Sequence, residues 1–164
     1  MRRLARTRLT AEEARSPERV RAAAVALLAR RDFASGELRQ KLERQGFERP
    51  LVEEAVADLV EGGVLNDARF AENYVSYHAG RGEGPLRIAA ELEALDLPTP
   101  LIEAALAAGP DWRARAREVR IRRFGVEVPE TWPQKARQGR FLQYRGFSSD
   151  HIRAALGPDF EPDE

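Results

Sequence analysis

The feature that most constrains the fold of this chain is a repeat of fifty residues within its own sequence. The same apolar positions recur at this spacing in three consecutive segments, without a gap. They are Leu42, Leu92 and Leu142; Phe47, Leu97 and Phe147; Val52, Ile102 and Ile152; Ala55, Ala105 and Ala155; and Val56, Leu106 and Leu156. Because all these positions stay in register, the pattern predicts a tandem array of three copies of one structural unit.

Each copy is predicted to consist of three helices. Positions 52, 55 and 56, and their equivalents in the other copies, place apolar side chains at i, i+3 and i+4, the spacing of one buried helix face. No segment alternates apolar and polar residues over the length of a strand, so the predicted fold class is all-α. The helices are expected near 17–31, 35–45 and 50–61; 67–80, 85–95 and 100–108; and 112–124, 132–145 and 149–156.

A glycine is predicted to end the second helix in two of the three copies. Gly46 and Gly146 each follow a helical stretch, where glycine adopts a positive φ without the steric cost of a Cβ atom. Leu42 and Phe47 then provide the apolar contact that accompanies such a cap. The second copy carries Asp96 at the equivalent position, where a positive φ is less favourable.

The domain organisation follows from the size of the repeat. A fifty-residue unit buries little apolar surface on its own, so neighbouring copies are expected to pack together. The predicted architecture is an elongated, curved array of three tandem three-helix repeats. Its predicted parts are a disordered basic tail at 1–15, repeats at 16–63, 64–109 and 110–157, and a disordered acidic tail at 158–164.

The composition excludes several classes of protein. There is no cysteine, which excludes disulfide frameworks and thiolate metal sites, and two histidines leave little for an imidazole metal site or a Ser–His triad. The longest apolar run, Ala22–Ala29, is far shorter than the roughly 20 residues of a membrane-spanning helix. We therefore expect a cytoplasmic protein that acts without a membrane, a metal ion or another cofactor.

Acidic and basic residues are segregated along the chain, although its net charge is zero. Residues 1–50 carry 13 basic and 7 acidic side chains, whereas residues 51–110 carry 3 and 11. Residues 112–145 carry 10 basic and 3 acidic side chains. This distribution favours a basic surface for a polyanion and an acidic second copy. A solvated repeat surface in an arginine-biased sequence accounts for the charges equally well.

The helix predicted at 112–124 is dense in arginine, with Glu118 as its only acidic residue. At about 100° per residue, the arginines flank an apolar stripe of Trp112, Ala116 and Val119 on both sides. Such a density of like charge is unfavourable unless an anion neutralises it, and arginine offers bidentate geometry for phosphate. The alternative is that these side chains pair with the acidic second copy or keep a marginal helix soluble. The candidate contact residues are Arg113, Arg115, Arg117, Arg120, Arg122 and Arg123.

The next predicted helix combines arginines and aromatic residues on one face. Guanidinium groups interleaved with rings suit a single-stranded nucleic acid, whose phosphates pair with arginine while its bases stack on the rings. Phe141 is predicted to belong to the repeat core, and Tyr144 is left open between core and base stacking. The candidate contact residues are Lys135, Arg137, Arg140, Tyr144 and Arg145.

No constellation of residues predicts catalysis. The glycine-rich segment 80–85 follows no strand and has the wrong spacing for a nucleotide-binding loop, so it is predicted to be a flexible hinge. Acidic residues such as Asp58 and Asp67 are expected on solvated faces and at helix caps, and His78 and His151 on the surface. The protein is therefore predicted not to be an enzyme.

Three segments resemble the signatures of the RecX family. They are Asn66–Ala71 (NDARFA), Gly84–Ile88 (GPLRI) followed by Glu91 and Leu92, and Arg140–Phe147 (RFLQYRGF). Their order and spacing agree with the family, and the resemblance runs from about residue 18 to residue 156. Asn66 differs from the Asp that the family often has at that position.

The resemblance implies a bacterial regulator of the RecA recombinase, built of three three-helix repeats. The family binds the filament of RecA on single-stranded DNA in its helical groove. It thereby blocks filament extension and suppresses ATP hydrolysis, strand exchange and co-protease activity. The implied partners are the RecA filament and single-stranded DNA, which a monomer would contact only weakly by itself. The motif and near-motif positions expected to make contacts are Arg81, Arg87, Arg137, Arg140 and Arg145.

Three other functions are compatible with parts of the sequence. A transcription regulator of the helix-turn-helix type would read duplex DNA, but the third helices at 50–61, 100–108 and 149–156 are poor in basic residues. A nuclease would need a carboxylate cluster that binds Mg²⁺. A structural adaptor would bind a filament without contacting nucleic acid, and its affinity would not depend on salt.

Overall fold

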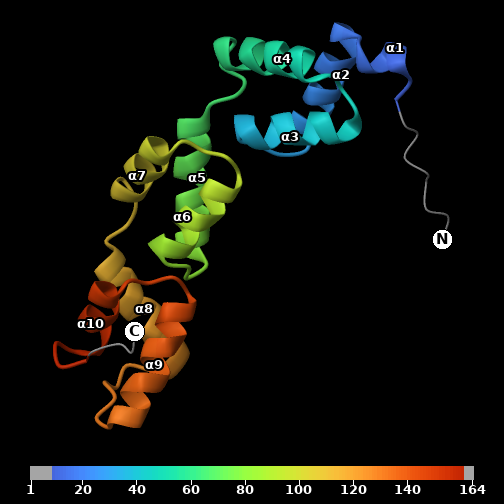
Figure 1. Cartoon of the computed structure of the whole chain (residues 1–164). Helices are drawn as coiled ribbons and strands as arrows, with labels where there is room; N and C mark the ends of the chain where they lie inside the picture. The colour runs from blue at the N-terminus through green and yellow to red at the C-terminus, as the bar shows by residue number, and fades with distance from the viewer. Residues whose placement is uncertain (1–8, 161–164) are drawn as a thin grey trace. The chain divides into compact units, whose positions relative to one another are not determined.

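The structure, a computed structural model, describes residues 9–160, and residues 1–8 and 161–164 lie outside this range (Figure 1). Within the described range every regular element is an α-helix, so the predicted all-α class is confirmed. The elements are α1 (Ala11–Ala14), α2 (Pro17–Leu28), α3 (Ser35–Gln45), α4 (Arg49–Glu61), α5 (Asp67–Gly80), α6 (Pro85–Ala94), α7 (Thr99–Ala107), α8 (Trp112–Phe124), α9 (Trp132–Tyr144) and α10 (Ser149–Leu156).

The predicted helices correspond to α2 through α10. We call α2–α4 the first repeat, α5–α7 the second repeat and α8–α10 the third repeat. The Cα positions divide the described residues into two compact units, one formed by 9–70 with Leu95–Leu97, the other by Ala71–Ala94 with 98–160. No helix in the described range is long and apolar enough to cross a membrane.

Capping residues explain where helices begin. At the start of α2 the Ser16 hydroxyl accepts a hydrogen bond from the backbone N–H of Arg19 at 3.3 Å. At the start of α8 the Asp111 carboxylate accepts one from the N–H of Arg113 at 3.0 Å. These bonds satisfy amides that the first turn of a helix leaves unpaired. Because such signals are local, these helix starts could be predicted from the sequence.

The predicted glycine caps are confirmed. Gly46 and Gly146 have φ values of 106° and 94°. Beyond Gly146, the N–H of Phe147 donates to the carbonyl of Leu142 at 3.1 Å, and the first repeat has the equivalent bond at 3.4 Å. The glycines thus reverse the chain so that the aromatic residue returns to its own repeat core.

Asp96 replaces glycine at this position in the second repeat, and its environment explains why the replacement is accommodated. It is the only non-glycine residue in the described range with a positive φ, 63°. Its side chain lies against Gly36 at the start of α3, where an added Cβ would be 2.7 Å from the Cβ of Asp96. The glycine that makes room at this contact is therefore Gly36 of the first repeat, whereas the second repeat carries a side chain there.

The joint between the second and third repeats has the opposite arrangement. A Cβ on Gly146 would lie 2.7 Å from the backbone nitrogen of Arg87, at the start of α6. Two backbone hydrogen bonds close this joint: Gly84 N–H to the carbonyl of Arg145 at 2.7 Å, and Leu86 N–H to that of Gly146 at 3.0 Å. Each joint thus contains a glycine at its closest contact, on one side or the other.

The repeated apolar positions form the cores. All of them are buried except Leu106, which is half-buried. Leu42 and Val52 belong to the core of the first repeat, and Leu142 and Ile152 belong to that of the third. The core assignment made from the fifty-residue spacing is therefore confirmed for these positions.

Residues 9–15, which were predicted to belong to a disordered tail at 1–15, are ordered in the structure. Thr10 and Glu13 form a capping box that begins α1, with the Glu13 N–H donating to Thr10 Oγ1 at 3.2 Å. The N–H of Glu48 donates to the carbonyl of Ala14 at 3.1 Å. The structure corrects the prediction for residues 9–15, because a single capped turn has no apolar periodicity that a sequence reading can detect. The rest of this predicted tail lies outside the described residues.

At the other end, the predicted acidic tail 158–164 begins with an ordered segment. The Phe160 side chain is 2% exposed and belongs to the core of the third repeat. Its ring centroid lies 5.4 Å from that of Trp132. An added Cβ on Gly139 would lie 2.7 Å from Phe160 Cε1, so α9 makes room for the ring. Residues 158–160 are thus corrected to ordered, and 161–164 lie outside the described range.

Candidate nucleic-acid interface

Two of the candidate arginines join α8 to α10. The Arg113 guanidinium donates two hydrogen bonds to the Asp150 carboxylate, at 2.8 and 3.1 Å. These bonds hold the pKa of Asp150 below its ordinary value. Arg117 Nε donates to the carbonyl of Ala154 at 2.8 Å. Both side chains are exposed, but their guanidinium groups already have acceptors within the third repeat.

Arg115 joins α8 to the second repeat. Its Nε donates to the carbonyl of Ala79, near the end of α5, at 2.8 Å, and its Nη1 donates to Glu118 at 2.6 Å. The side chain is 21% exposed. Arg115 therefore has acceptors within the protein, but none of them is an acidic side chain of the second repeat.

Arg120 is a correction to the sequence analysis, because it does not lie on the surface. The residue is 3% exposed. Its guanidinium donates to the carbonyls of Glu127 and Val126, at 2.9 and 3.3 Å, and to Gln138 Oε1 at 3.4 Å. Its Nε has no partner within the described range. Arg120 thus anchors the segment between α8 and α9 instead of facing a partner.

Four arginines instead converge on a small cavity, which we call the arginine pocket. Arg81 comes from the loop after α5, and Arg145 from the residue after α9. Arg122 and Arg123 come from the last turn of α8. The cavity has a volume of about 110 Å³, and the remaining lining residues are Gly82, Val119 and Phe141. No carboxylate lines it.

Three of the four pocket arginines contact aromatic side chains, and none of the four pairs with an acidic residue in the described range. The guanidinium of Arg145 lies 5.5 Å from the ring centroid of Phe141, and that of Arg123 lies 5.5 Å from Phe124. Arg81 donates to the Tyr77 hydroxyl at 3.1 Å. Such contacts orient a guanidinium without neutralising its charge.

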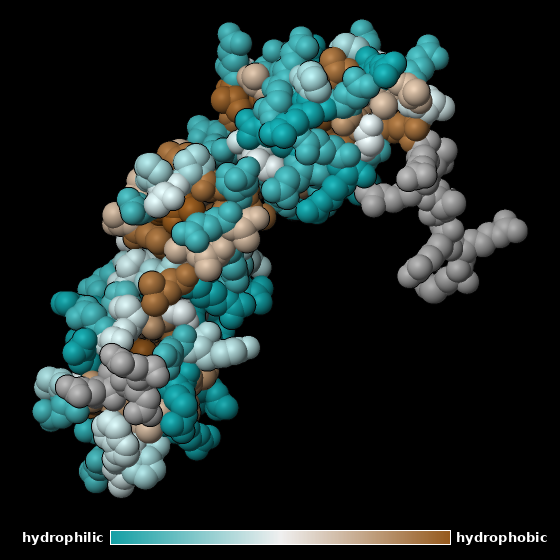
Figure 2. Space-filling model, viewed as in Figure 1, coloured by the Kyte–Doolittle hydropathy of each residue, from teal (hydrophilic) through white to brown (hydrophobic). Residues whose placement is uncertain are grey.

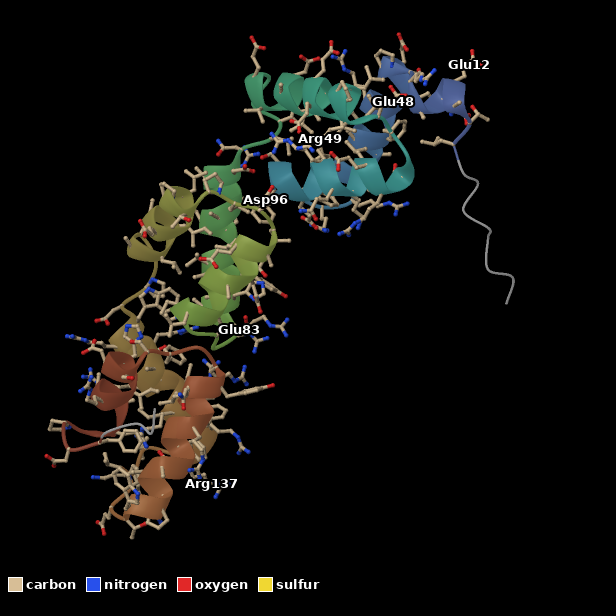
Figure 3. All side chains as sticks on the ribbon, in the orientation of Figure 1. Glu12, Glu48, Arg49, Glu83, Asp96 and Arg137 are labelled. Carbon is tan, nitrogen blue, oxygen red and sulfur yellow. The ribbon has the colours of Figure 1, made fainter. Side chains whose placement is uncertain are left out.

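The outer face of α9 carries the remaining candidates. Arg137 and Arg140 are exposed, Lys135 is half-buried, and Arg137 projects from the helix in Figure 3. Tyr144 is 81% exposed, which places its ring in solvent rather than in the core. Phe141 packs against the core of the third repeat, as predicted. Figure 2 shows mainly hydrophilic residues over α9 on the visible face.

Arg87 belongs to a different cluster, in the second repeat. Its Nε lies 3.0 Å from Glu91 and 3.6 Å from Glu83, and the hydrogen bond to Glu91 raises the pKa of Arg87. His78 Nδ1 lies 2.8 Å from Glu83 Oε2, so His78 is not the surface residue that was expected. Tyr74 donates to Glu91 at 2.9 Å; burial, then this bond, raise the pKa of Tyr74 to about 12.

This cluster fixes the segment 80–85, which was predicted to be a flexible hinge. Glu83, labelled in Figure 3, is only 6% exposed and is held by His78 and Arg87. The next residue is bonded to the third repeat through Gly84 N–H. The prediction was wrong because the glycines serve a close backbone approach, for which the sequence alone shows no partner.

The same cluster contains a potential set of metal ligands. One ligand atom each from His78, Glu83 and Glu91 lies within 4.8 Å of the others. The Arg87 guanidinium, however, already pairs with both carboxylates. We interpret the group as an ion-paired network that stiffens the second repeat, because its negative charge is compensated from within.

Fold and site together define a class of protein: a helical-repeat protein with an arginine-rich surface. Family models recognise each repeat separately. The chain matches RecX, first three-helix domain, over residues 21–59; the second over 66–106; and the third over 111–156. The chain therefore belongs to the RecX family of regulatory proteins, and the resemblance seen in its motifs is confirmed.

The chain is similar to proteins named Regulatory protein RecX over nearly its whole length. The chain is 44% identical over 154 residues to Regulatory protein RecX of Halorhodospira halophila, covering 93% of this chain and 96% of the relative. It is 42% identical over 142 residues to Regulatory protein RecX of Pseudomonas syringae pv. tomato, covering 86% and 92%.

Solved structures share the fold. The crystal structure of RecX from Lactobacillus salivarius superimposes with a TM-score of 0.74 at 19% identity, covering 90% of this chain and 96% of that one. A second crystal structure of regulatory protein RecX gives a TM-score of 0.72, covering 85% and 70%. The organisation as three tandem three-helix domains is confirmed.

Proposed function

We propose that this protein is a negative modulator of the RecA recombinase that binds the filament of RecA on single-stranded DNA. In this proposal it inhibits filament extension, ATP hydrolysis, strand exchange and co-protease activity. It acts in the cytoplasm, as a monomer and without catalysis of its own. Membership in a family of regulatory proteins supports the regulatory part of the proposal.

The observation that carries the proposal is a group of five arginines, at the pocket and on the outer face of α9, that the fold leaves without an acidic partner. They are Arg122, Arg123 and Arg145 at the pocket and Arg137 and Arg140 on α9; within the described range none of them has a carboxylate within ion-pair distance. Uncompensated guanidinium groups on one repeat favour a polyanionic partner, and a nucleoprotein filament presents phosphates. In contrast, hydrogen bonds to acceptors within the third repeat engage the guanidinium groups of Arg113, Arg117 and Arg120.

The proposed mechanism is a shift in population. A ligand that binds one state of a filament more tightly than the others draws the filament toward that state. The arginines of the third repeat would approach DNA phosphates or acidic RecA surface, and the acidic second repeat would face basic patches on another protomer. Contact with more than one protomer would hold the filament in a state that neither extends nor hydrolyses ATP.

The structure gives little support to the alternative of an operator-reading transcription regulator. Such a protein inserts the last helix of its three-helix unit into the major groove and reads bases with it. Here α7 carries no basic side chain, and the only arginine of α10 is Arg153.

The variant Arg137→Glu/Arg140→Glu tests the proposal. We expect the concentration of this variant that half-inhibits RecA ATP hydrolysis on single-stranded DNA to rise at least about tenfold, because two charge-assisted contacts become repulsive. Helicity measured by circular dichroism should stay unchanged, since both residues are exposed.

Arg30→Glu/Arg44→Glu is the matched control. Both residues are exposed, both lie in the first unit, and the pair gives the same change in net charge. The control should inhibit RecA as the wild type does. Undiminished inhibition by Arg137→Glu/Arg140→Glu would remove the α9 face from the mechanism.

A further inference from the structure

The arginine pocket contains more positive charge than its surroundings compensate. Arg122 has no hydrogen-bond or ion-pair partner in the described range, and Arg123 and Arg145 contact only aromatic rings. The nearest buried carboxylate on the Arg81 loop, Glu83, is held by His78 at 2.8 Å. Guanidinium groups brought together in this way repel one another unless an anion lies between them.

The pocket is also held rigid. Gly82 has a φ of 85°, and an added Cβ there would lie 3.2 Å from Val119 Cγ2. The loop that carries Arg81 therefore packs closely against α8. The Gly84 N–H bond to the carbonyl of Arg145, at 2.7 Å, fixes the loop to the end of α9. Side chains on a fixed frame lose less conformational entropy when they bind a ligand.

The size of the pocket limits its ligand. A volume of about 110 Å³ is well below the roughly 300 Å³ at which pockets begin to enclose drug-sized molecules. A nucleotide is therefore too large to enter, but a single tetrahedral oxyanion group is not. Arginine forks bind such groups through paired, charge-assisted hydrogen bonds.

The residues beside the pocket fit a polymer that continues past it. On α9, at about 100° per residue, Tyr144 lies about 60° around the helix from the pocket residue Phe141, and Arg140 lies a further 40° beyond. Proteins that bind single-stranded nucleic acids commonly place an exposed ring between basic side chains. The bases stack on the ring while the phosphates pair with the arginines.

We propose that the arginine pocket binds one phosphodiester phosphate of a single strand of nucleic acid, and that Tyr144 stacks on a neighbouring base. The inference deepens the proposed function and rests on it for the identity of the polymer. It assigns the contact to the DNA of the filament rather than to acidic side chains of a protein.

The test uses the full chain without RecA. The probe is a fluorescein-labelled oligothymidylate, and its binding is measured by fluorescence anisotropy at several salt concentrations. In Arg81→Gln/Arg122→Gln the dissociation constant should rise about tenfold or more, and the slope of log K against log salt should fall in magnitude by about 0.7, the value for one phosphate contact on a single strand. Arg30→Gln/Arg44→Gln, which removes the same charge, should leave both quantities unchanged.

Tyr144 is tested with two substitutions. Tyr144→Ala should weaken oligothymidylate binding severalfold, whereas Tyr144→Phe, which keeps a ring, should retain the wild-type affinity. Because the residue is 81% exposed, neither substitution is expected to alter folding. Equal affinity of the Ala and Phe variants would overturn the stacking contact.

A parallel RecA ATPase titration separates this inference from the proposed function. Loss of RecA inhibition by Arg81→Gln/Arg122→Gln with unchanged oligothymidylate binding would overturn the phosphate assignment and place the pocket against protein. Oligothymidylate binding that fails in this variant but not in its control would support the assignment whatever happens to RecA. A wild-type protein with no measurable oligothymidylate affinity at low salt would overturn the inference, even if RecA inhibition is intact.

Discussion

The fold decides which arginines of this chain already have an acceptor for their guanidinium groups within the protein. Arg113 and Arg122 lie on the same helix, yet the first meets Asp150 and the second lines the arginine pocket. The sequence predicted both as contact residues, because the acceptor Asp150 lies 37 positions away. Acceptors so distant in the sequence explain why the internal hydrogen bonds of Arg113, Arg115 and Arg117 could not be predicted.

At the scale of one residue, Arg120 is expected to contribute to stability rather than to binding. Arg120→Met keeps the volume but removes the donors to the carbonyls of Val126 and Glu127. The free energy of unfolding in urea should fall by roughly 1–3 kcal/mol, because partly buried acceptors lose their partner. Arg123→Met, an exposed neighbour, should change it by less than about 0.5 kcal/mol. Equal effects of the two substitutions would contradict the anchoring role.

His151 is expected to give α10 a pH-dependent cap. Its Nδ1 accepts a hydrogen bond from the Ser148 backbone N–H at 3.3 Å, which only the neutral ring can do. Burial lowers the pKa of His151 from its ordinary value of 6.5. The unfolded chain therefore takes up the proton first, so this contribution to stability is complete above about pH 6.5 and is lost as pH falls toward the lower folded pKa.

The matched variant is His151→Gln, because glutamine serves the same position of a capping box without titrating. Chemical denaturation between about pH 7 and pH 5 should show a steeper loss of stability in the wild type than in this variant. Identical pH profiles of the two proteins would contradict the titrating cap.

At the scale of elements, the sequence predicts what local chemistry decides. Gly46 and Gly146 marked the ends of α3 and α9 because a positive φ is an intrinsic property of the residue. The repeat spacing extended the same conformation to Asp96, whose φ of 63° no local rule would select. The segment α1 escaped prediction because its single capped turn has no apolar periodicity, and the docked loop 80–85 escaped it because its partners lie far away in the sequence.

The joint between the first and second repeats is expected to show energetic coupling. In Gly36→Ala the new methyl group would lie 2.7 Å from Asp96 Cβ, so the free energy of unfolding should fall by roughly 1–3 kcal/mol. Asp96→Gly should change stability little, because glycine adopts the same φ readily. The double variant removes the clash. Its loss of unfolding free energy should therefore be smaller than the sum of the losses in the two single variants.

Gly62→Ala is the control for the loss of a glycine. The residue lies at the end of α4 with an ordinary negative φ, and its effect should be additive with Asp96→Gly. Additive effects of Gly36→Ala and Asp96→Gly would show that the two residues do not meet.

The whole molecule uses one three-helix unit three times, with apolar residues at the same core positions and different charges on the surface. The cores repeat with the fifty-residue spacing, so the number of repeats could be predicted from apolar positions alone. The arginine pocket could not, because its walls come from α8, the end of α9 and the loop after α5. The backbone joint at Gly84 and Gly146 and the contact of Gly82 with Val119 bring those segments together.

The most direct measurement of the central claim is RecA ATP hydrolysis on single-stranded DNA, titrated with this protein at low and at moderate salt. We expect inhibition at both, with a higher half-inhibitory concentration at moderate salt, because contacts between arginine and phosphate release counterions. RecA turnover that stays unchanged at saturating protein and low salt would contradict it.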